Sequence, residues 1–192
     1  MDEFWVFGYG SLMWRPGFDF IDASHARLFG YHRALCVKSH VHRGTPERPG
    51  LVLGLDRGGS CRGIAFSVAG EKADQVLDYL RSRELVTHVY KERRVPIELR
   101  SGRRVHAVAY VVDRAHVQYA GDLSSGEAAS IVRGAVGQSG PNEDYVINTV
   151  NHLRQMQISD HWLEQVARQI ADPEGGMGGS DDGAGAPDVS SR

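Results

Sequence analysis

Strand-like and helix-like patterns occupy separate parts of this chain of 192 residues, and their order limits the possible folds more than any other feature. Apolar segments bounded by turn residues lie mainly before residue 113, whereas apolar residues at helical spacing dominate after it. Neither a βαβ alternation nor an internal repeat is visible. Because strands followed by helices are typical of α+β domains, the sequence predicts an α+β fold whose strands curl into a mixed sheet or small barrel.

Local patterns place the individual elements. Strands are expected at residues 4–7, 26–37, 51–55, 62–68, 88–99 and 103–112. A first helix is expected from about Gly70 to residues 81–84, because apolar residues recur there at steps of three and four. Three later helices are indicated by a capping box from Ser124 to Glu127, by Pro141 in a first turn, and by Ser159 as an N-cap.

The composition is that of an ordinary globular protein, with 41% hydrophobic and 24% charged residues and a net charge of −2. This charge argues against nucleic acid as a partner, and no apolar run approaches the roughly 20 residues that span a bilayer. Asp2 and Glu3 stand where a signal peptide would carry basic residues, so a cytoplasmic protein without a membrane partner is expected. Cys36 and Cys61 match no metal spacing and are expected to be buried free thiols.

The C-terminal segment differs in composition from the rest of the chain. Residues 172–192 are rich in Gly, Asp and Ser, contain no aromatic residue, and carry five acids against Arg192. Such a segment cannot bury enough apolar surface to offset the entropy lost on ordering. We therefore expect one domain over residues 1–171, followed by a disordered, acidic, Gly-rich tail over residues 172–192, and the sequence leaves the oligomeric state open.

The first candidate site is the loop that follows the N-terminal strand. An apolar run reaches Val6 and Phe7 and stops at Gly8-Tyr9-Gly10-Ser11-Leu12. Glycines let a ligand approach the main chain closely, and a tight loop after a buried strand exposes N–H groups and a hydroxyl. The loop is therefore a candidate for binding a small anion or carbonyl, although an ordinary turn after a strand would show the same pattern.

The second candidate is Glu84, at the end of the first predicted helix. It continues the apolar stripe of Leu77 and Leu80, and a carboxylate on such a stripe is costly unless it is paired or protonated. One interpretation is a general base whose pKa is raised by partial burial. The other is an ordinary ion pair with Arg81 or Arg83, or a side chain that faces solvent.

Two further segments complete the candidates. The constrained, cationic loop over residues 42–50 could hold a substrate carboxylate through Arg43, or it is simply a basic surface loop. The pair His40 and His42 lacks partner ligands, so no metal is expected. The segment over residues 139–145 could bring a helix N-terminus and the Tyr145 hydroxyl to a pocket, or serve only as a helix cap.

Together these four segments resemble the ChaC-type, glutathione-specific γ-glutamylcyclotransferases. The resemblance covers about residues 4–170 and rests on the segments Val6-Phe7-Gly8-Tyr9-Gly10-Ser11-Leu12-Met13-Trp14, His42-Arg43-Gly44-Thr45-Pro46 with Pro49-Gly50, Tyr79-Leu80-Arg81-Ser82-Arg83-Glu84 and Gly140-Pro141-Asn142-Glu143-Asp144-Tyr145. One departure is Leu85-Val86-Thr87-His88, where many relatives have a turn that contains glycine. The resemblance implies a γ-glutamylcyclotransferase-like fold, a small mixed β-barrel with packed helices.

The resemblance also implies an activity and a set of roles. Glutathione would be cleaved to 5-oxoproline and cysteinylglycine by attack of its own α-amine, without a cofactor or metal. The catalytic glutamate of the family falls on Glu84, and its γ-glutamyl-binding loop falls on Val6 through Leu12. We expect substrate-positioning roles for Tyr9 and Tyr145. Two other interpretations remain, a cyclotransferase for other γ-glutamyl compounds and a non-catalytic module that binds a small anion.

Overall fold

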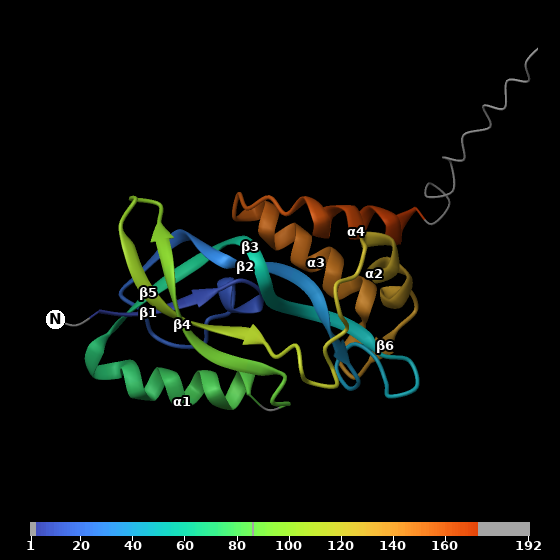
Figure 1. Ribbon diagram of the computed structural model, residues 1–192, viewed down its shortest axis with the longest axis horizontal. Helices are drawn as coiled ribbons and strands as arrows, with labels where there is room; N and C mark the ends of the chain where they lie inside the picture. Colours follow the sequence, from blue (N-terminus) through green and yellow to red (C-terminus); the bar gives the residue numbers. More distant parts are fainter. Residues whose placement is uncertain (1–2, 86, 173–192) are drawn as a thin grey trace, which may run out of the picture.

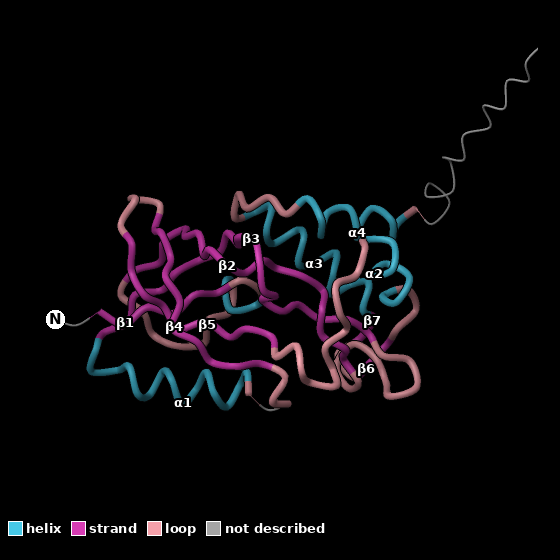
Figure 2. The backbone as a smooth tube through the Cα atoms, viewed as in Figure 1, coloured by secondary structure: helices cyan, strands magenta, loops and turns pink. Residues whose placement is uncertain are grey.

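The computed structural model describes residues 3–85 and 87–172, so the tail expected from residue 172 onward lies almost entirely outside the described residues. Figures 1 and 2 show strands that run from one end of the molecule toward the other, with helices packed along its sides. The strands are β1 (Glu3–Gly8), β2 (Asp22–Ser39), β3 (Gly50–Ala69), β4 (Tyr90–Leu99), β5 (Arg104–Val112), β6 (Val136–Gly137) and β7 (Gly140–Pro141). The helices are η1 (Ser11–Met13), η2 (Gly70–Lys72), α1 (Ala73–Glu84), α2 (Ser125–Val132), α3 (Asn142–Gln155) and α4 (His161–Ala171).

Five strands close into a barrel in the order β1-β3-β2-β4-β5. The neighbouring pairs are antiparallel, except that β1 and β5 close the barrel as a short parallel pair at Trp5–Ala107 and Val6–Val108. The predicted α+β fold with a small mixed barrel is thereby confirmed. The N-terminal strand β1 therefore pairs with β3 along one edge and with β5 along the other.

Strand β1 is apolar from Phe4 to Phe7, where both of its faces are buried. Phe4 and Val6 pack outward against α1, whereas Trp5 and Phe7 belong to the main core. Successive side chains of a strand point to opposite faces, so a strand covered on both sides reads as a continuous apolar run. In Figure 1, α1 lies along one side of the barrel, and α2, α3 and α4 lie together on the other side.

Strand β3 differs from the expectation. The sequence predicted separate strands at residues 51–55 and 62–68, but one strand runs from Gly50 to Ala69. The register against β2 shifts between Phe29 and Tyr31, where Gly58 and Gly59 have φ of 104° and 68°. These positive φ values are accessible to glycine without strain, so the polar, Gly-rich segment forms an irregularity inside the strand instead of a turn.

The helix ends confirm one prediction and correct two. Ser124 and Glu127 form the predicted capping box of α2. Pro141 precedes α3 as its N-cap residue and does not lie in its first turn. The N-cap of α4 is Asp160, whose carboxylate accepts from the Leu163 N–H at 3.1 Å, and the prediction of Ser159 was wrong. Asp160 is favoured because the same carboxylate also pairs with Arg33.

The first part of β3, over residues 50–63, pairs with β2 along one edge but not with β1 along the other. Side chains bind this other edge, which we call the second edge of β3. Asn142, fully buried at the start of α3, accepts from the Leu51 N–H at 2.7 Å and donates to the Leu51 carbonyl at 2.8 Å. Two residues further on, Tyr145 and Tyr90 bind the Leu53 N–H and carbonyl. Buried main-chain groups must be hydrogen-bonded, so these contacts fix α3 against β3.

We expect Asn142→Ala to destabilise the protein by at least about 2 kcal/mol, because it leaves two buried main-chain groups without a partner. Urea unfolding measures this change in the free energy of unfolding. Asn151→Ala is the matched control, since Asn151 is an exposed residue of the same helix. A loss for Asn142→Ala no larger than that of the control would show that the two contacts do not hold α3 in place.

Candidate active site

The loop after β1 leads into a small pocket with a volume of about 100 Å³. Four predicted loop residues line it, and the other walls come from distant parts of the chain: Glu84 at the end of α1, Tyr145 from α3, Tyr90 and Tyr110 from the barrel, and the edge of β3. The complete lining is Tyr9, Gly10, Ser11, Leu12, Val52, Leu53, Glu84, Tyr90, Tyr110 and Tyr145. Elements from the whole domain therefore meet at one concave site.

The remaining predicted loop residues lie beneath the pocket. Val6 packs in the cluster under α1, and Phe7 packs in the main core. A Cβ on Gly8 would lie 3.3 Å from the Leu12 Cβ and from the Met13 nitrogen, so the loop folds tightly back on this glycine. These three residues support the loop, and their predicted contact with a substrate stays a prediction.

Glu84 is the carboxylate of the pocket, and its side chain is 19% exposed. Burial raises the pKa of Glu84, while the neighbouring charge of Arg83 lowers it in part. Arg83 Nε lies 3.1 Å from Glu84 Oε1, so the ion pair considered from the sequence does form, and it forms with Arg83. The raised pKa shows that burial outweighs this pair, as expected for a group that takes up and releases a proton.

Arg83 also connects the helix end to the loop. Its Nη2 donates to Ser11 Oγ at 2.8 Å, and its Nη1 donates to the Arg15 carbonyl at 2.8 Å. One guanidinium therefore contacts both Glu84 and the loop residue Ser11 and holds the helix end next to the loop. A planar group with five donors suits this bridging position better than a lysine ammonium does.

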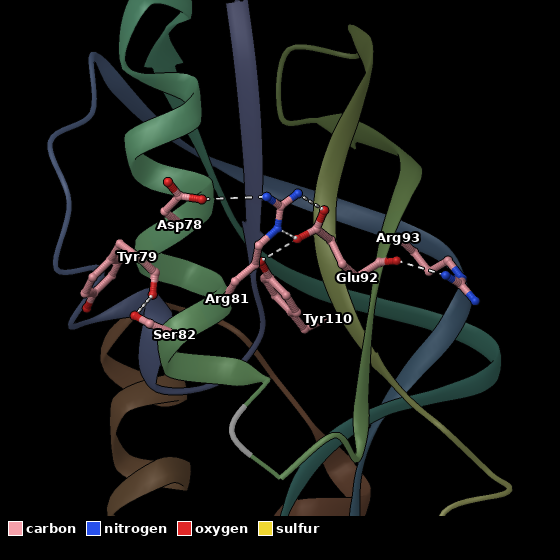
Figure 3. Close-up of polar contacts among 7 residues, drawn as sticks. All are labelled: Asp78, Tyr79, Arg81, Ser82, Glu92, Arg93 and Tyr110. Carbon is pink, nitrogen blue, oxygen red and sulfur yellow. Dashed lines mark hydrogen bonds and ion pairs between the residues drawn. The ribbon is translucent and has the colours of Figure 1, made fainter.

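Arg81 attaches the last turn of α1 to the barrel. Its Nε and Nη2 each donate to one oxygen of Glu92 at 2.9 Å, and the Tyr110 hydroxyl donates to Glu92 Oε2 at 3.1 Å (Figure 3). Arg81 and Tyr110 lower the pKa of Glu92 against the effect of burial. Glu92 is thus an ionised acceptor that joins α1, β4 and β5 directly beside the pocket.

Arg33 supports the loop from within the protein. Its buried guanidinium donates to the Tyr9 carbonyl at 2.6 Å and to the Arg62 carbonyl at 2.7 Å, and pairs with Asp160 at 2.9 Å. A larger cavity of about 370 Å³ is lined by Arg33 and Asp160 and shares no residue with the pocket. Its buried charges are neutralised, Arg33 by Asp160 and Asp56 by Arg114, so we place the candidate site at the smaller pocket, where Glu84 lies.

The structure places Arg43 outside the pocket lining. Its Nη1 donates to the Ser139 carbonyl at 2.6 Å, and its guanidinium carbon lies 5.3 Å from the centre of the Tyr145 ring. Arg43 therefore contacts the back of a pocket residue. Its predicted contact with a substrate carboxylate stays a prediction.

Sequence reasoning missed Tyr90, Tyr110, Val52 and Leu53. The two tyrosines lie in barrel strands, where an aromatic residue is ordinary core material. A buried tyrosine needs a partner for its hydroxyl, and these partners are the Leu53 carbonyl and Glu92. Their location at the pocket depends on pairing between β4 and β5 and on the position of β3, which no local pattern reveals.

Within residues 3–85 and 87–172, no three His, Cys, Asp or Glu side chains are arranged as a metal site. In the same part of the chain, no helix has the length and apolar character needed to cross a membrane. Cys36 and Cys61 are buried free thiols, and burial raises the pKa of each, that of Cys61 to about 11.

The fold is shared with known proteins. A yeast crystal structure described as a γ-glutamyl cyclotransferase specific to glutathione superposes with a TM-score of 0.78, covering 89% of this chain and 96% of that one at 23% sequence identity. The barrel with its packed helices is therefore the γ-glutamyl cyclotransferase fold.

The family model described as "ChaC-like protein" matches residues 4–172. The glutathione-specific gamma-glutamylcyclotransferase of Escherichia coli (strain K12) is 33% identical over 162 residues, which are 84% of this chain and 70% of that protein. The glutathione-specific gamma-glutamylcyclotransferase 1 of Danio rerio is 34% identical over 154 residues, covering 78% of this chain and 79% of that protein. The chain belongs to the ChaC-like protein family.

The raised pKa of Glu84 predicts a specific pH dependence of stability. Below the ordinary value of 4.5 the carboxyl is protonated in the folded and the unfolded chain and causes no penalty. As the pH rises from 4.5 through the higher folded value, ionisation costs the folded state more than the unfolded state, and stability is lost. We therefore expect Glu84→Gln to be at least as stable as the wild type at pH 7.5, with the difference narrowing toward pH 4.

Urea unfolding of both proteins across this pH range measures the difference. A Glu84→Gln variant that is less stable at neutral pH, with the gap closing in acid, would show instead that the ion pair with Arg83 outweighs burial.

Proposed function

We propose that the protein is a γ-glutamylcyclotransferase that converts glutathione to 5-oxoproline and cysteinylglycine. The observation that carries the proposal is the partly buried carboxylate of Glu84, whose pKa is raised, in the same pocket of about 100 Å³ as the loop residues Gly10 to Leu12. The family relatives in bacteria and animals carry the same activity in their names. The protein would thus act in glutathione catabolism.

The chemistry is an intramolecular transfer. The α-amine of the γ-glutamyl group attacks its γ-carbonyl carbon, a C–N bond closes the five-membered ring, and the bond to the cysteine nitrogen breaks. A pocket that holds the γ-glutamyl chain folded brings nucleophile and carbonyl together, and well-oriented intramolecular reactions reach effective molarities of about 10⁵–10⁸ M. Positioning therefore supplies much of the acceleration.

Two protons leave the α-nitrogen during this reaction, because an ammonium becomes the N–H of a lactam, and the leaving nitrogen must gain a proton. An α-amine with a pKa near ~8 is mostly an ammonium at neutral pH, and it cannot attack until it loses a proton. We assign Glu84 to accept a proton from the α-nitrogen and to pass it to the cysteine nitrogen as that nitrogen leaves, while the second proton ends on the released amine or in water. A carboxylate whose pKa is raised by burial is a stronger base than an exposed one, which suits both halves of the transfer.

Main-chain donors are available for the oxyanion. The N–H groups at the start of a helical turn have no partner within the turn, and η1 begins at Ser11. We assign the γ-carbonyl oxygen to the N–H groups of Gly10, Ser11 and Leu12. Arg33 and Arg83, which hold the Tyr9 carbonyl and the Ser11 hydroxyl, keep this loop in position before the substrate arrives.

Neither a different γ-glutamyl substrate nor a non-catalytic anion-binding module is favoured by an observation in the structure. A module that only binds an anion has no need of a buried proton acceptor, whereas Glu84 with its raised pKa is such a group. A cytoplasmic location is part of the proposal, since two buried thiols persist as thiols in a reducing compartment.

Glu84→Gln should reduce kcat for release of 5-oxoproline from glutathione by ~10²-fold or more, because the amide keeps the shape but cannot accept a proton. Chromatographic detection of 5-oxoproline measures this loss, and the substrate should still bind. Glu71→Gln, the same exchange at an exposed residue of η2, should leave kcat unchanged. A Glu84→Gln enzyme that retained a tenth of the wild-type kcat would refute the assignment.

Glutathione should exceed γ-glutamylcysteine in kcat/KM by at least tenfold, or about 1.4 kcal/mol, because contacts with the terminal glycine help to align the reacting centre. N-acetylation of the α-amine, or an α-linkage in place of the γ-linkage, should stop the reaction. Equal kcat/KM for glutathione and γ-glutamylcysteine would leave the ring closure in place and contradict specificity for glutathione.

A further inference from the structure

Two tyrosine hydroxyls of the pocket bind the main chain of the same residue in opposite senses. The Tyr90 hydroxyl donates to the Leu53 carbonyl at 2.7 Å. The Tyr145 hydroxyl accepts from the Leu53 N–H at 3.1 Å. Tyr90 comes from β4 and Tyr145 from α3, and Leu53 of β3 lies between them in the pocket wall.

The hydrogen positions follow from the chemistry of the partners. A carbonyl oxygen can only accept and an amide N–H can only donate, so neither hydrogen bond can be reversed. The single hydrogen of Tyr90 is therefore occupied, and its oxygen can only accept from a ligand. Tyr145 keeps its hydrogen and can donate it. Two residues of the same type thus give the pocket an acceptor on one side and a donor on the other.

The charged groups near the two hydroxyls agree with this assignment of acceptor and donor. The pKa of Tyr90 is raised by burial, by Tyr145 and by the charge of Glu84. Burial raises the pKa of Tyr145 to about 12, and the charge of Glu84 also raises it, while the Leu53 N–H, Arg43 and Arg33 act to lower it. Both phenols therefore stay protonated at neutral pH. The charge of Glu84 acts on both phenols, whereas Arg43 and Arg33 act on the donor Tyr145, and the guanidinium of Arg43 lies over its ring.

The Tyr110 hydroxyl does not share this arrangement. It donates to the ionised Glu92, and its side chain is packed beneath α1 in the cluster that contains Leu80 and Leu12 (Figure 3). The polarity of the pocket thus depends on Tyr90 and Tyr145, together with Glu84 and the loop amides.

We propose that Tyr90 accepts a hydrogen bond from the substrate α-ammonium beside Glu84, and that Tyr145 donates to the substrate α-carboxylate. This inference rests on the proposed function, and it orients the γ-glutamyl group. One N–H of the ammonium is held by Tyr90 while another faces Glu84, so the proton that must leave points at the base. Tyr90 is then a specificity-determining residue for a free amine.

The test uses two analogues that each lack one of the groups. Glutaryl-cysteinylglycine has no α-amine, and 4-aminobutanoyl-cysteinylglycine has no α-carboxylate. Their dissociation constants are measured by calorimetry at pH 7 in the Glu84→Gln background, where turnover is suppressed, and with Tyr90→Phe or Tyr145→Phe added. The readout is the ratio of the two dissociation constants.

Tyr90→Phe should weaken the amine-bearing analogue about tenfold relative to the glutaryl analogue, as expected for a hydrogen bond to a charged group. Tyr145→Phe should shift the ratio in the opposite direction. Each change also removes one partner of Leu53, and a purely structural effect would weaken both analogues equally. An unchanged ratio in both variants overturns the proposal.

The test stays decisive if Tyr90→Phe does not fold. Tyr145→Phe is then measured alone, and an unchanged ratio in that variant overturns the proposal. Failure of the proposed function is seen separately. If the wild-type enzyme releases no 5-oxoproline from glutathione, the proposed function and this inference are both wrong. If the enzyme is active but the ratio of dissociation constants does not change in the variants, only the roles of the two hydroxyls are wrong.

Discussion

The second edge of β3 is the constraint on which the rest of the structure depends. Where β3 extends beyond its pairing with β1, its main-chain groups on that side need partners from side chains, because buried N–H and C=O groups without hydrogen bonds are costly. Asn142 binds Leu51, and Tyr145 and Tyr90 bind Leu53. The residues that satisfy this edge also bring α3 and β4 to the pocket, so the fold and the candidate site share the same hydrogen bonds.

The position of Glu84 shows how a carboxylate is kept in a costly environment. Burial alone would favour rotation of the side chain into solvent or displacement of the helix end. Arg83 ties the helix end to the loop, and Arg81 ties it to Glu92 on β4, so the last turn of α1 is held from two directions. Removing the charge of Glu84 removes the free-energy cost of burying it. Removing Arg81 or Arg83 would instead remove the contacts that hold the last turn of α1 in position. Stability and reactivity are therefore opposed at this residue.

Local sequence patterns accounted for a definite part of the structure. The apolar run of β1, the periodicity of α1 and the Ser124–Glu127 capping box depend on neighbours within a few residues, and each was predictable. The continuous β3 was not, because its course through the polar segment depends on pairing with β2. The cap of α4 was missed for a similar reason, since Asp160 is selected partly by Arg33, which lies 127 residues away in the chain. At the site, Glu84 and the loop residues lay in recognisable segments, whereas Tyr90 and Tyr110 become pocket residues only when the barrel closes.

The contacts of Arg33 limit how far the chain could be shortened without disturbing the loop of the candidate site. One guanidinium joins the carbonyl of Tyr9, in the loop that would bind the substrate, to the carboxylate of Asp160, which begins the last helix. The part of the chain that ends with β5 contains every candidate group except Tyr145, yet the loop takes its shape partly from a residue beyond that part. A shortened protein that ended before α4 would leave a buried arginine without its counter-ion directly beneath the loop. The C-terminal helices therefore belong to the minimal enzyme, and the domain is indivisible with respect to catalysis as well as folding.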